Sequence, residues 1–179
     1  MKYLEVLLTT DAMEKGPRLI VTADALRTVE KGGDGADGKE TGGVLIGFHE
    51  GKDIRVVKAS DAGPNAQRSA CGFLRDTAYC QGMLDREHSL SGADYVGEWH
   101  THVIDLPHPS EGDLLTLASI ILDPDYNFPS FSMLLVVKRP RGTEIQGYMV
   151  TAEGASSQHS SARKVQVARV VPVIQESDR

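Results

Sequence analysis

The stretch Tyr95-Val-Gly-Glu-Trp-His-Thr-His102, followed after seven intervening residues by Ser110-Glu-Gly-Asp113, decides how this 179-residue chain is organised. Its first part alternates in polarity and carries Tyr, Val and Trp, which is typical of a half-buried β-strand. Because residues two apart on a strand point to the same face, His100 and His102 present two imidazoles side by side. The stretch therefore predicts a strand that ends in a pair of potential metal ligands.

A helix is predicted to begin at Ser110, after a turn that contains Asp105, Pro107 and Pro109. Ser110 is a favourable N-cap residue, and Asp113 occupies the third helical position, where a carboxylate also complements the helix dipole. From this position Asp113 can point back towards the two histidines. Capping of the helix is an ordinary structural explanation of both residues, and it stays open at this stage.

Two imidazoles and one carboxylate provide three protein ligands, the set found in catalytic zinc sites that leave one position for water. A structural zinc site more often has four protein ligands, usually with cysteines, and neither Cys71 nor Cys80 belongs to a Cys-x-x-Cys pair. We therefore predict a catalytic metal site formed by His100, His102 and Asp113.

A candidate proton carrier lies far upstream, in Lys39-Glu-Thr-Gly-Gly-Val-Leu-Ile-Gly47. Zinc lowers the pKa of a bound water from about 15.7 to about 7. Amide hydrolysis also needs a group that takes the water proton and returns it to the leaving amine. Glu40, just before the apolar run 44–46, is placed to do this without ligating the metal. Taken alone, its ordinary interpretation is a solvated residue at the start of a strand.

The other histidines give weaker signals. His108 could replace Asp113 as the third ligand, but its position in a Pro-flanked loop favours contact with a substrate, and Asp105 is similar. His88 is expected near the end of a helix, where a partial positive charge is favourable, with no catalytic role. His49 and His159 are expected at the surface.

Length and composition fit one globular domain. The apolar fraction is 40%, the charged fraction is 25% and the net charge is −6, so we expect no broad binding to nucleic acid or acidic membranes. Two cysteines suit a reducing compartment. Glu5 interrupts the apolar start, which argues against a signal peptide, and no stretch approaches the ~20 apolar residues of a membrane span. The prediction is a cytoplasmic protein.

The remaining pattern predicts an α/β domain in which strands and helices alternate around a mixed sheet. Pro172 suggests that the last strand lies at an edge. Residues 1–152 are assigned to the domain proper, and 153–179 to a loose loop and a C-terminal edge strand or tail. The expected elements are strands at 3–9, 19–21, 44–48, 53–59, 95–102, 131–138, 144–150 and 165–173, helices at 23–30, 73–88 and 110–122, and loops at 31–38, 62–68 and 152–161.

An upstream Glu, then His-x-His, seven residues, Ser, two residues and Asp together resemble the JAMM motif of the JAB/MPN metalloprotease family. The resemblance extends from the first predicted helix to the strand near residue 150. It implies the MPN/JAB fold, a mixed, mostly antiparallel central sheet flanked by helices and similar to cytidine deaminases. It implies that His100, His102 and Asp113 bind one catalytic Zn2+. It also implies that Glu40 is the general acid/base and that Ser110 helps to stabilise the oxyanion.

The chain departs from the family pattern at one place. Many members have Pro directly after the second histidine, whereas Val103 and Ile104 follow here. The resemblance therefore defines the loop over the site less well than it defines the ligands.

By resemblance, the chain is a peptidase or isopeptidase that cleaves after the C-terminal glycine of ubiquitin or a ubiquitin-like protein, by deconjugation or precursor processing. It resembles the stand-alone prokaryotic JAB peptidases, some of which are encoded beside E1- and E2-like proteins, including in antiphage CBASS operons. The implied partners are a ubiquitin-like protein or its conjugate and such E1/E2-like proteins. One alternative is a peptidase that releases an amino acid, such as cysteine, from a sulfur-carrier protein. The other is a non-catalytic MPN scaffold, although scaffolds usually lack the ligands.

Overall fold

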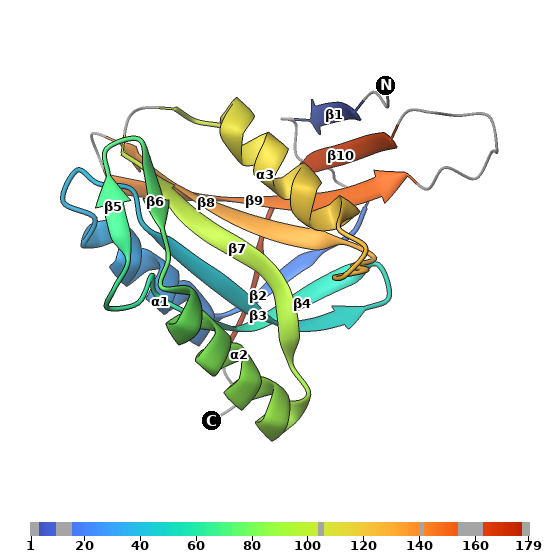
Figure 1. The fold of residues 1–179 in the computed structure, drawn as a ribbon, viewed down its shortest axis with the longest axis horizontal. Helices are drawn as coiled ribbons and strands as arrows, with labels where there is room; N and C mark the ends of the chain where they lie inside the picture. The colour runs from blue at the N-terminus through green and yellow to red at the C-terminus, as the bar shows by residue number, and fades with distance from the viewer. Residues whose placement is uncertain (1–3, 10–15, 104–105, 140–141, 154–162, 177–179) are drawn as a thin grey trace.

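The computed structural model describes residues 4–9, 16–103, 106–139, 142–153 and 163–176. These residues form a curled nine-stranded sheet, a separate two-stranded hairpin and three helices (Figure 1). The strands are β1 (Leu4–Thr9), β2 (Leu19–Thr22), β3 (Gly42–Glu50), β4 (Asp53–Ala59), β5 (Gln67–Ser69), β6 (Gly72–Leu74), β7 (Asp94–His102), β8 (Phe131–Arg139), β9 (Gly142–Glu153), β10 (Arg163–Val170) and β11 (Val173–Gln175); the helices are α1 (Ala23–Asp34), α2 (Thr77–Ser91) and α3 (Glu111–Leu122).

The large sheet is mixed and has the order β1-β10-β9-β8-β7-β3-β4-β2-β11. Most of its paired residues are antiparallel, in the ladders β10–β9, β9–β8, β7–β3 and β3–β4. The adjacent central strands β7 and β8 are parallel, and α3 makes the crossover between them. The predicted mixed, mostly antiparallel sheet with flanking helices is confirmed.

The strand β8 explains how the layers pack, because both of its faces are covered. Leu134 and Val136 join the core beneath α1, whereas the alternate residues Met133 and Leu135 join the core beneath α3. A strand buried on both faces reads as a continuous apolar run. The sequence 131–138 was predicted as a central strand for this reason, and β8 confirms it. Within the described segments, none of the helices is long and apolar enough to cross a membrane.

The helix α1 is longer than predicted. It continues through residues 31–34, which were predicted to belong to a loop. The helix can continue here because Gly32 and Gly33 have no Cβ atoms. A Cβ on Gly32 would overlap the Trp99 ring, and one on Gly33 would lie 2.8 Å from Val136 Cγ1. These glycines let the helix backbone lie directly on the sheet, so they mark close packing rather than a loop.

The segment before α2 was also predicted wrongly. Residues 67–69 and 72–74 form the hairpin β5–β6, where a loop and the first turn of a helix were expected. The helix begins after Asp76, whose side chain accepts a hydrogen bond of 3.2 Å from Tyr79 N. It ends at Gly92, which is left-handed with φ of 73°. The two strands are short and largely exposed, so they carry no alternating pattern that could reveal them.

The predicted C-terminal edge strand divides into two strands. β10 lies between β1 and β9 and is therefore not an edge, whereas β11 forms the opposite edge beside β2. Pro172 separates them, because proline cannot donate to a ladder. The predicted loop 152–161 is partly replaced by the end of β9, and its residues 154–161 lie outside the described residues.

We predict opposite effects of the same substitution in two helices. Gly32→Ala should lower the melting temperature and the free energy of unfolding, since the methyl group overlaps Trp99. Gly82→Ala in α2 should raise stability by up to about 1 kcal/mol, because no atom lies within 4 Å of its Cβ and alanine favours a helix. Urea unfolding of both variants measures the difference; equal effects would contradict the packing described for α1.

Candidate metal centre

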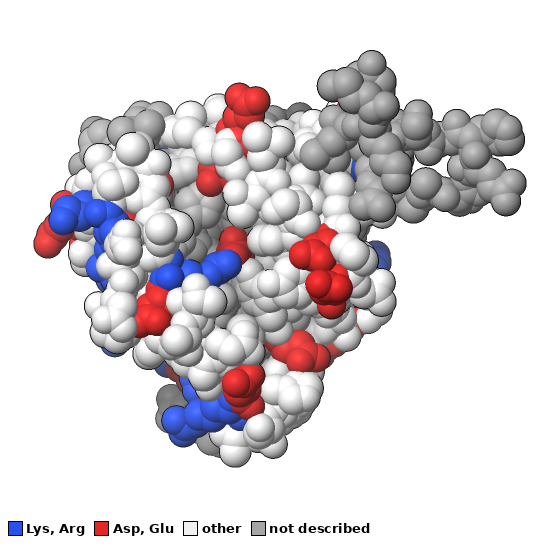
Figure 2. All heavy atoms as spheres, viewed as in Figure 1, with Lys and Arg blue, Asp and Glu red and all other residues white. Residues whose placement is uncertain are grey.

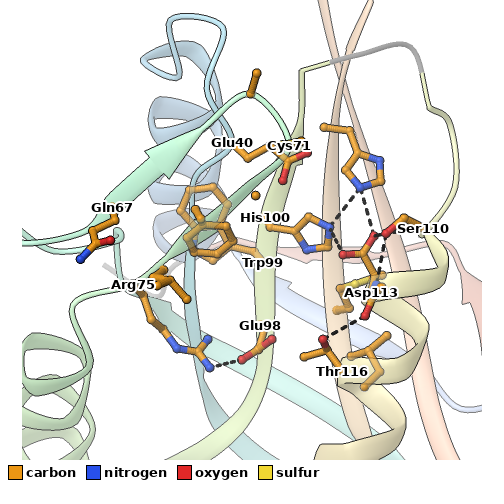
Figure 3. A pocket seen from close by; sticks show the side chains of 18 of the residues that line it. Glu40, Gln67, Cys71, Arg75, Glu98, Trp99, His100, Ser110, Asp113 and Thr116 are labelled. Carbon is orange, nitrogen blue, oxygen red and sulfur yellow. Dashed lines mark hydrogen bonds and ion pairs between the residues drawn. The ribbon is translucent and has the colours of Figure 1, made fainter.

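The candidate site lies where β7 ends and α3 begins. The β7–α3–β8 crossover brings the carboxyl end of the strand against the amino end of the helix (Figure 1). His100 points from β7 towards Asp113, which extends from the first turn of α3 (Figure 3). His102, two residues further along β7, contacts the same carboxylate. Both histidines are buried, with 8% and 3% of their surface exposed. The structure therefore brings together the three residues that the sequence placed near one another.

The three side chains converge on a small volume. His100 Nε2 lies 3.3 Å from His102 Nε2 and 3.2 Å from Asp113 Oδ1, and His102 Nε2 lies 3.1 Å from Asp113 Oδ2. Zinc ligands lie about 2.0–2.2 Å from the ion, so the corners of a tetrahedral site are separated by about 3.3 Å. The observed separations match this spacing.

The hydrogen bond of His102 indicates why a cation fits here. Its Nδ1 lies 3.0 Å from the carbonyl oxygen of Leu106, which can only accept. Nδ1 therefore carries a proton, and Nε2 of the neutral ring has a lone pair aimed at Asp113 and His100. Converging lone pairs repel one another unless a proton or a metal ion lies between them. A backbone carbonyl that orients a histidine in this way is typical of metal sites.

Ser110 and Asp113 form a capping box as well as part of the site. Asp113 N donates to Ser110 Oγ over 3.2 Å, and Asp113 Oδ2 accepts from Ser110 N and from Ser110 Oγ, both at 2.7 Å. The capping explanation and the proximity to the histidines are thus both correct. The cap fixes the carboxylate, which then faces the imidazoles without freedom to rotate away.

The electrostatics of the cluster favour a positive charge at its centre. Burial opposes ionisation of Asp113, but the two imidazoles, which donate to the carboxylate when both ring nitrogens are protonated, and the Ser110 hydroxyl outweigh it and hold the pKa of this carboxyl well below its usual range. Burial lowers the pKa of His102, yet its contacts with Asp113 and Leu106 reverse this, so the net pKa of the imidazole is raised. Either a proton or a divalent cation between these side chains would be stabilised by the negative charge of Asp113.

Glu40 lies on the same cleft as the three residues (Figure 3). Its backbone N donates to Ser69 O over 2.7 Å, and the next residue, Thr41, exchanges hydrogen bonds of 2.8 and 2.9 Å with Thr101 on β7. These bonds fix Glu40 between the hairpin and the end of β7. Burial raises the pKa of Glu40, while His102 partly opposes the rise. Glu40 is thus half-buried and lines the same cleft as the cluster.

The cleft around the cluster measures about 920 Å³. Its lining residues come from β7, from the hairpin β5–β6 and from α3. In Figure 1, β7 runs between the hairpin and α3. Figure 2 shows this face hollowed near its centre, with basic and acidic side chains close together beside the hollow.

Two charged residues of the cleft were missed in the sequence analysis. Glu98 lies on the floor two residues before His100, and Arg75 reaches it from the end of β6 and forms an ion pair with it (Figure 3). The alternation Glu98, His100, His102 was a usable signal, because these residues share one face of a strand. No sequence signal pointed to Arg75, since its segment was predicted to be helical.

The other candidate residues lie apart from the cluster. His108 is exposed, and its Nδ1 lies 3.2 Å from Pro109 O. His88 is exposed on the last turn of α2 and pairs with Asp94 at 2.7 Å. His49 was expected at the surface but is half-buried, with Nε2 2.8 Å from Ser130 O. The candidates Asp105 and His159 lie outside the described residues, and so does Ile104, which follows Val103 in the loop.

Two histidines and an aspartate that could hold a metal ion thus meet at a strand–helix crossover of a curled mixed sheet. The chain belongs to the family of prokaryotic homologs of the JAB domain, which matches residues 23–153. A structural relative is protein DSY2949 from Desulfitobacterium hafniense, whose solution structure superposes with a TM-score of 0.61 over 89% of this chain and 94% of that chain. Its sequence is 18% identical, so this likeness concerns the fold alone.

Three curated relatives carry the name CD-NTase/cGAS isopeptidase. Those from Escherichia coli and Vibrio cholerae are 35% and 37% identical over 42% and 41% of this chain, and each match covers 49% of the relative. That from Enterobacter hormaechei is 28% identical over 64% of both chains. The matches thus span about half to two thirds of the length of these relatives.

We predict that Asp113→Asn sharply lowers the zinc content of the purified protein, because it removes the anionic ligand. His108→Gln should retain the wild-type content, since its ring lies apart from the cluster. Elemental analysis after dialysis against trace zinc measures both, and circular dichroism verifies the fold. Zinc loss in His108→Gln with retention in Asp113→Asn would instead favour His108 as the third ligand.

Proposed function

We propose that this protein is a zinc-dependent isopeptidase that cleaves after the C-terminal glycine of a ubiquitin-like protein, releasing it from a target or a precursor. The observation that carries the proposal is the convergence of His100, His102 and Asp113 in an open cleft that also holds Glu40. The isopeptidase names of the relatives support the same class of reaction. E1- and E2-like enzymes are the class of partner that would form such a conjugate.

The three ligands leave room for one further ligand, as catalytic zinc sites do. When bound there, zinc supplies a Lewis acid that polarises a carbonyl group and lowers the pKa of a water. The residues His100, His102 and Asp113 would hold the ion, and Leu106 O would hold the ring of His102 in the required tautomer.

Glu40 moves the proton in this proposal. Its carboxylate takes a proton from the attacking water and returns it to the leaving amine, which is the ε-amino group of a lysine in an isopeptide. Its half-buried position raises its pKa, and a raised pKa suits a group that must both accept and donate near neutral pH. Its backbone bond to Ser69 keeps the carboxylate at the cleft.

Ser110 has two tasks in the proposed reaction. In the free protein its hydroxyl donates to Asp113 Oδ2 and so orients that ligand. To stabilise an oxyanion, the hydroxyl must turn from Asp113 towards the substrate. One donor of this kind commonly contributes about 3 kcal/mol to the transition state. Loss of Ser110 would therefore affect both the ligand and the reaction.

The hairpin β5–β6 offers a place for an extended substrate tail. It is a two-stranded sheet by itself, and an isolated pair of strands is marginally stable. An added peptide strand would complete backbone hydrogen bonds at its free edge, which is a common mode of peptide recognition. A tail that ends in glycine can lie in a narrow part of the cleft, because it carries no side chain.

We predict that Glu40→Gln abolishes hydrolysis while zinc stays bound, because the amide cannot carry the proton. Glu111→Gln is the matched control, since Glu111 is exposed on the first turn of α3, near the cluster, and does not line the cleft. Cleavage of a ubiquitin-like fusion and zinc content should be measured on both variants. Unchanged cleavage by Glu40→Gln would remove this residue from the mechanism.

The substrate class can be tested against the alternatives. The zinc-loaded protein should release a ubiquitin-like protein from a C-terminal fusion, and a chelator should stop the reaction. A carrier protein with a single cysteine at its C-terminus should be cleaved more slowly. The opposite preference would favour the sulfur-carrier function, whereas stable folding with no zinc and no cleavage of either substrate would favour a scaffold.

A further inference from the structure

One ion pair of the cleft takes no part in the proposed hydrolysis. The guanidinium of Arg75 pairs with Glu98, whose Oε1 also accepts a hydrogen bond of 2.6 Å from the Tyr95 hydroxyl. The side chains of Arg75 and Glu98 are 29% and 15% exposed. Among the described residues that line the cleft, Arg75 is the one lysine or arginine.

The strand β7 fixes the distance of this pair from the metal centre. Glu98, His100 and His102 share one face, so the pair lies one two-residue repeat, about 7 Å, before His100. A register shift against β3 leaves Val96 as an extra residue, which turns Tyr95 to the same face as Glu98. The bulge thus provides the hydroxyl that holds Glu98 beneath Arg75.

Most of the hydrogen-bond donors of Arg75 remain available to a ligand. The guanidinium carries five N–H donors. In the described residues its bonds are the ion pair with Glu98 and a long contact of 3.5 Å to the Tyr95 hydroxyl. No fully buried polar side-chain atom of the described residues lacks a partner, so the remaining donors are not sealed in the interior. Arg75 lines both this cleft and the neighbouring one that Cys80, Leu84 and Tyr95 also line.

An extended peptide places acceptors at the matching distance. Its carbonyl groups at positions i and i−2 point to the same side and are about 7 Å apart. A scissile carbonyl at the metal centre would therefore bring the carbonyl two residues earlier to Arg75. The lysine on the other side of an isopeptide bond offers only methylene groups over this distance. Arg75 also directly follows β6, so it lies next to the hairpin with which we propose that the extended substrate tail pairs.

We propose that Arg75, held by Glu98, is a specificity-determining residue that donates hydrogen bonds to the main-chain carbonyl two residues before the scissile glycine. This inference rests on the proposed peptidase function and adds a requirement for substrate length. The preferred substrate is an extended tail of at least three residues before the cleaved bond. A substrate that ends before this carbonyl would not engage Arg75.

Two fluorogenic probes differ in this feature. Acetyl-Ala-Ala-Gly-Gly-aminomethylcoumarin contains the carbonyl, and acetyl-Gly-aminomethylcoumarin lacks it. Arg75→Gln should lower kcat/KM for the long probe by about 10- to 100-fold, the effect of one charge-assisted hydrogen bond, and leave the short probe unchanged. Arg27→Gln on the exposed side of α1 is the matched control and should change neither probe.

Arg75→Lys separates recognition from a structural role. Lysine keeps the charge and can pair with Glu98, but it lacks the planar set of donors. The long probe should therefore still be cleaved severalfold more slowly. Full recovery with lysine, or an equal loss on both probes with glutamine, would overturn the proposal and leave Arg75 as a residue that only holds the hairpin.

Binding gives a readout that does not depend on hydrolysis. The peptide acid acetyl-Ala-Ala-Gly-Gly should bind the zinc-loaded protein at least about tenfold more tightly than it binds Arg75→Gln, as measured by calorimetry. If this difference is found but neither probe is cleaved, the hydrolase proposal fails and the subsite stands. Equal affinities, or no binding to the unaltered protein, overturn the subsite.

Discussion

The register of β7 is the constraint on which the site depends. Its pairing with β3 and β8 turns His100 and His102 towards α3 and turns Trp99 and Thr101 towards α1. A slip of one residue would exchange these two sets of side chains. Trp99 opposes such a slip, because its ring is fully buried and its Nε1 donates to Ser60 O over 2.7 Å. The packing of one face therefore sets the position of the ligands on the other.

The helix cap is the second point at which stability and chemistry share the same atoms. Asp113 completes the capping box of α3 and at the same time faces the two imidazoles. Its carboxylate is consequently positioned before any metal binds, so little conformational freedom remains to be lost on binding. Leu106 O has a similar effect on His102. The cleft is thus built from a strand and a helix end that the sheet already holds together.

Elements with strong periodicity were predicted well, and elements defined by packing were not. The alternation before His100 and the apolar run of β8 predicted their strands, because each pattern follows from which faces are buried. The glycines at 32 and 33 were taken for a loop, since their contact with Trp99 and Val136 joins residues far apart in the chain. The hairpin β5–β6 escaped detection because its residues are mostly exposed.

The sequence by itself determined the ligand types, their spacing and the family, since a strand period and a helix cap are local properties. Glu40 could be proposed from the sequence, but only the fold decided that it lies beside the histidines. The reason is that Gly42 at the start of β3 pairs with His100 of β7, a residue far along the chain. The same holds for Arg75 and Glu98, which meet through the packing of a hairpin against a distant strand. Contacts between remote segments depend on the burial and pairing of the whole sheet, so no local sequence pattern predicts them.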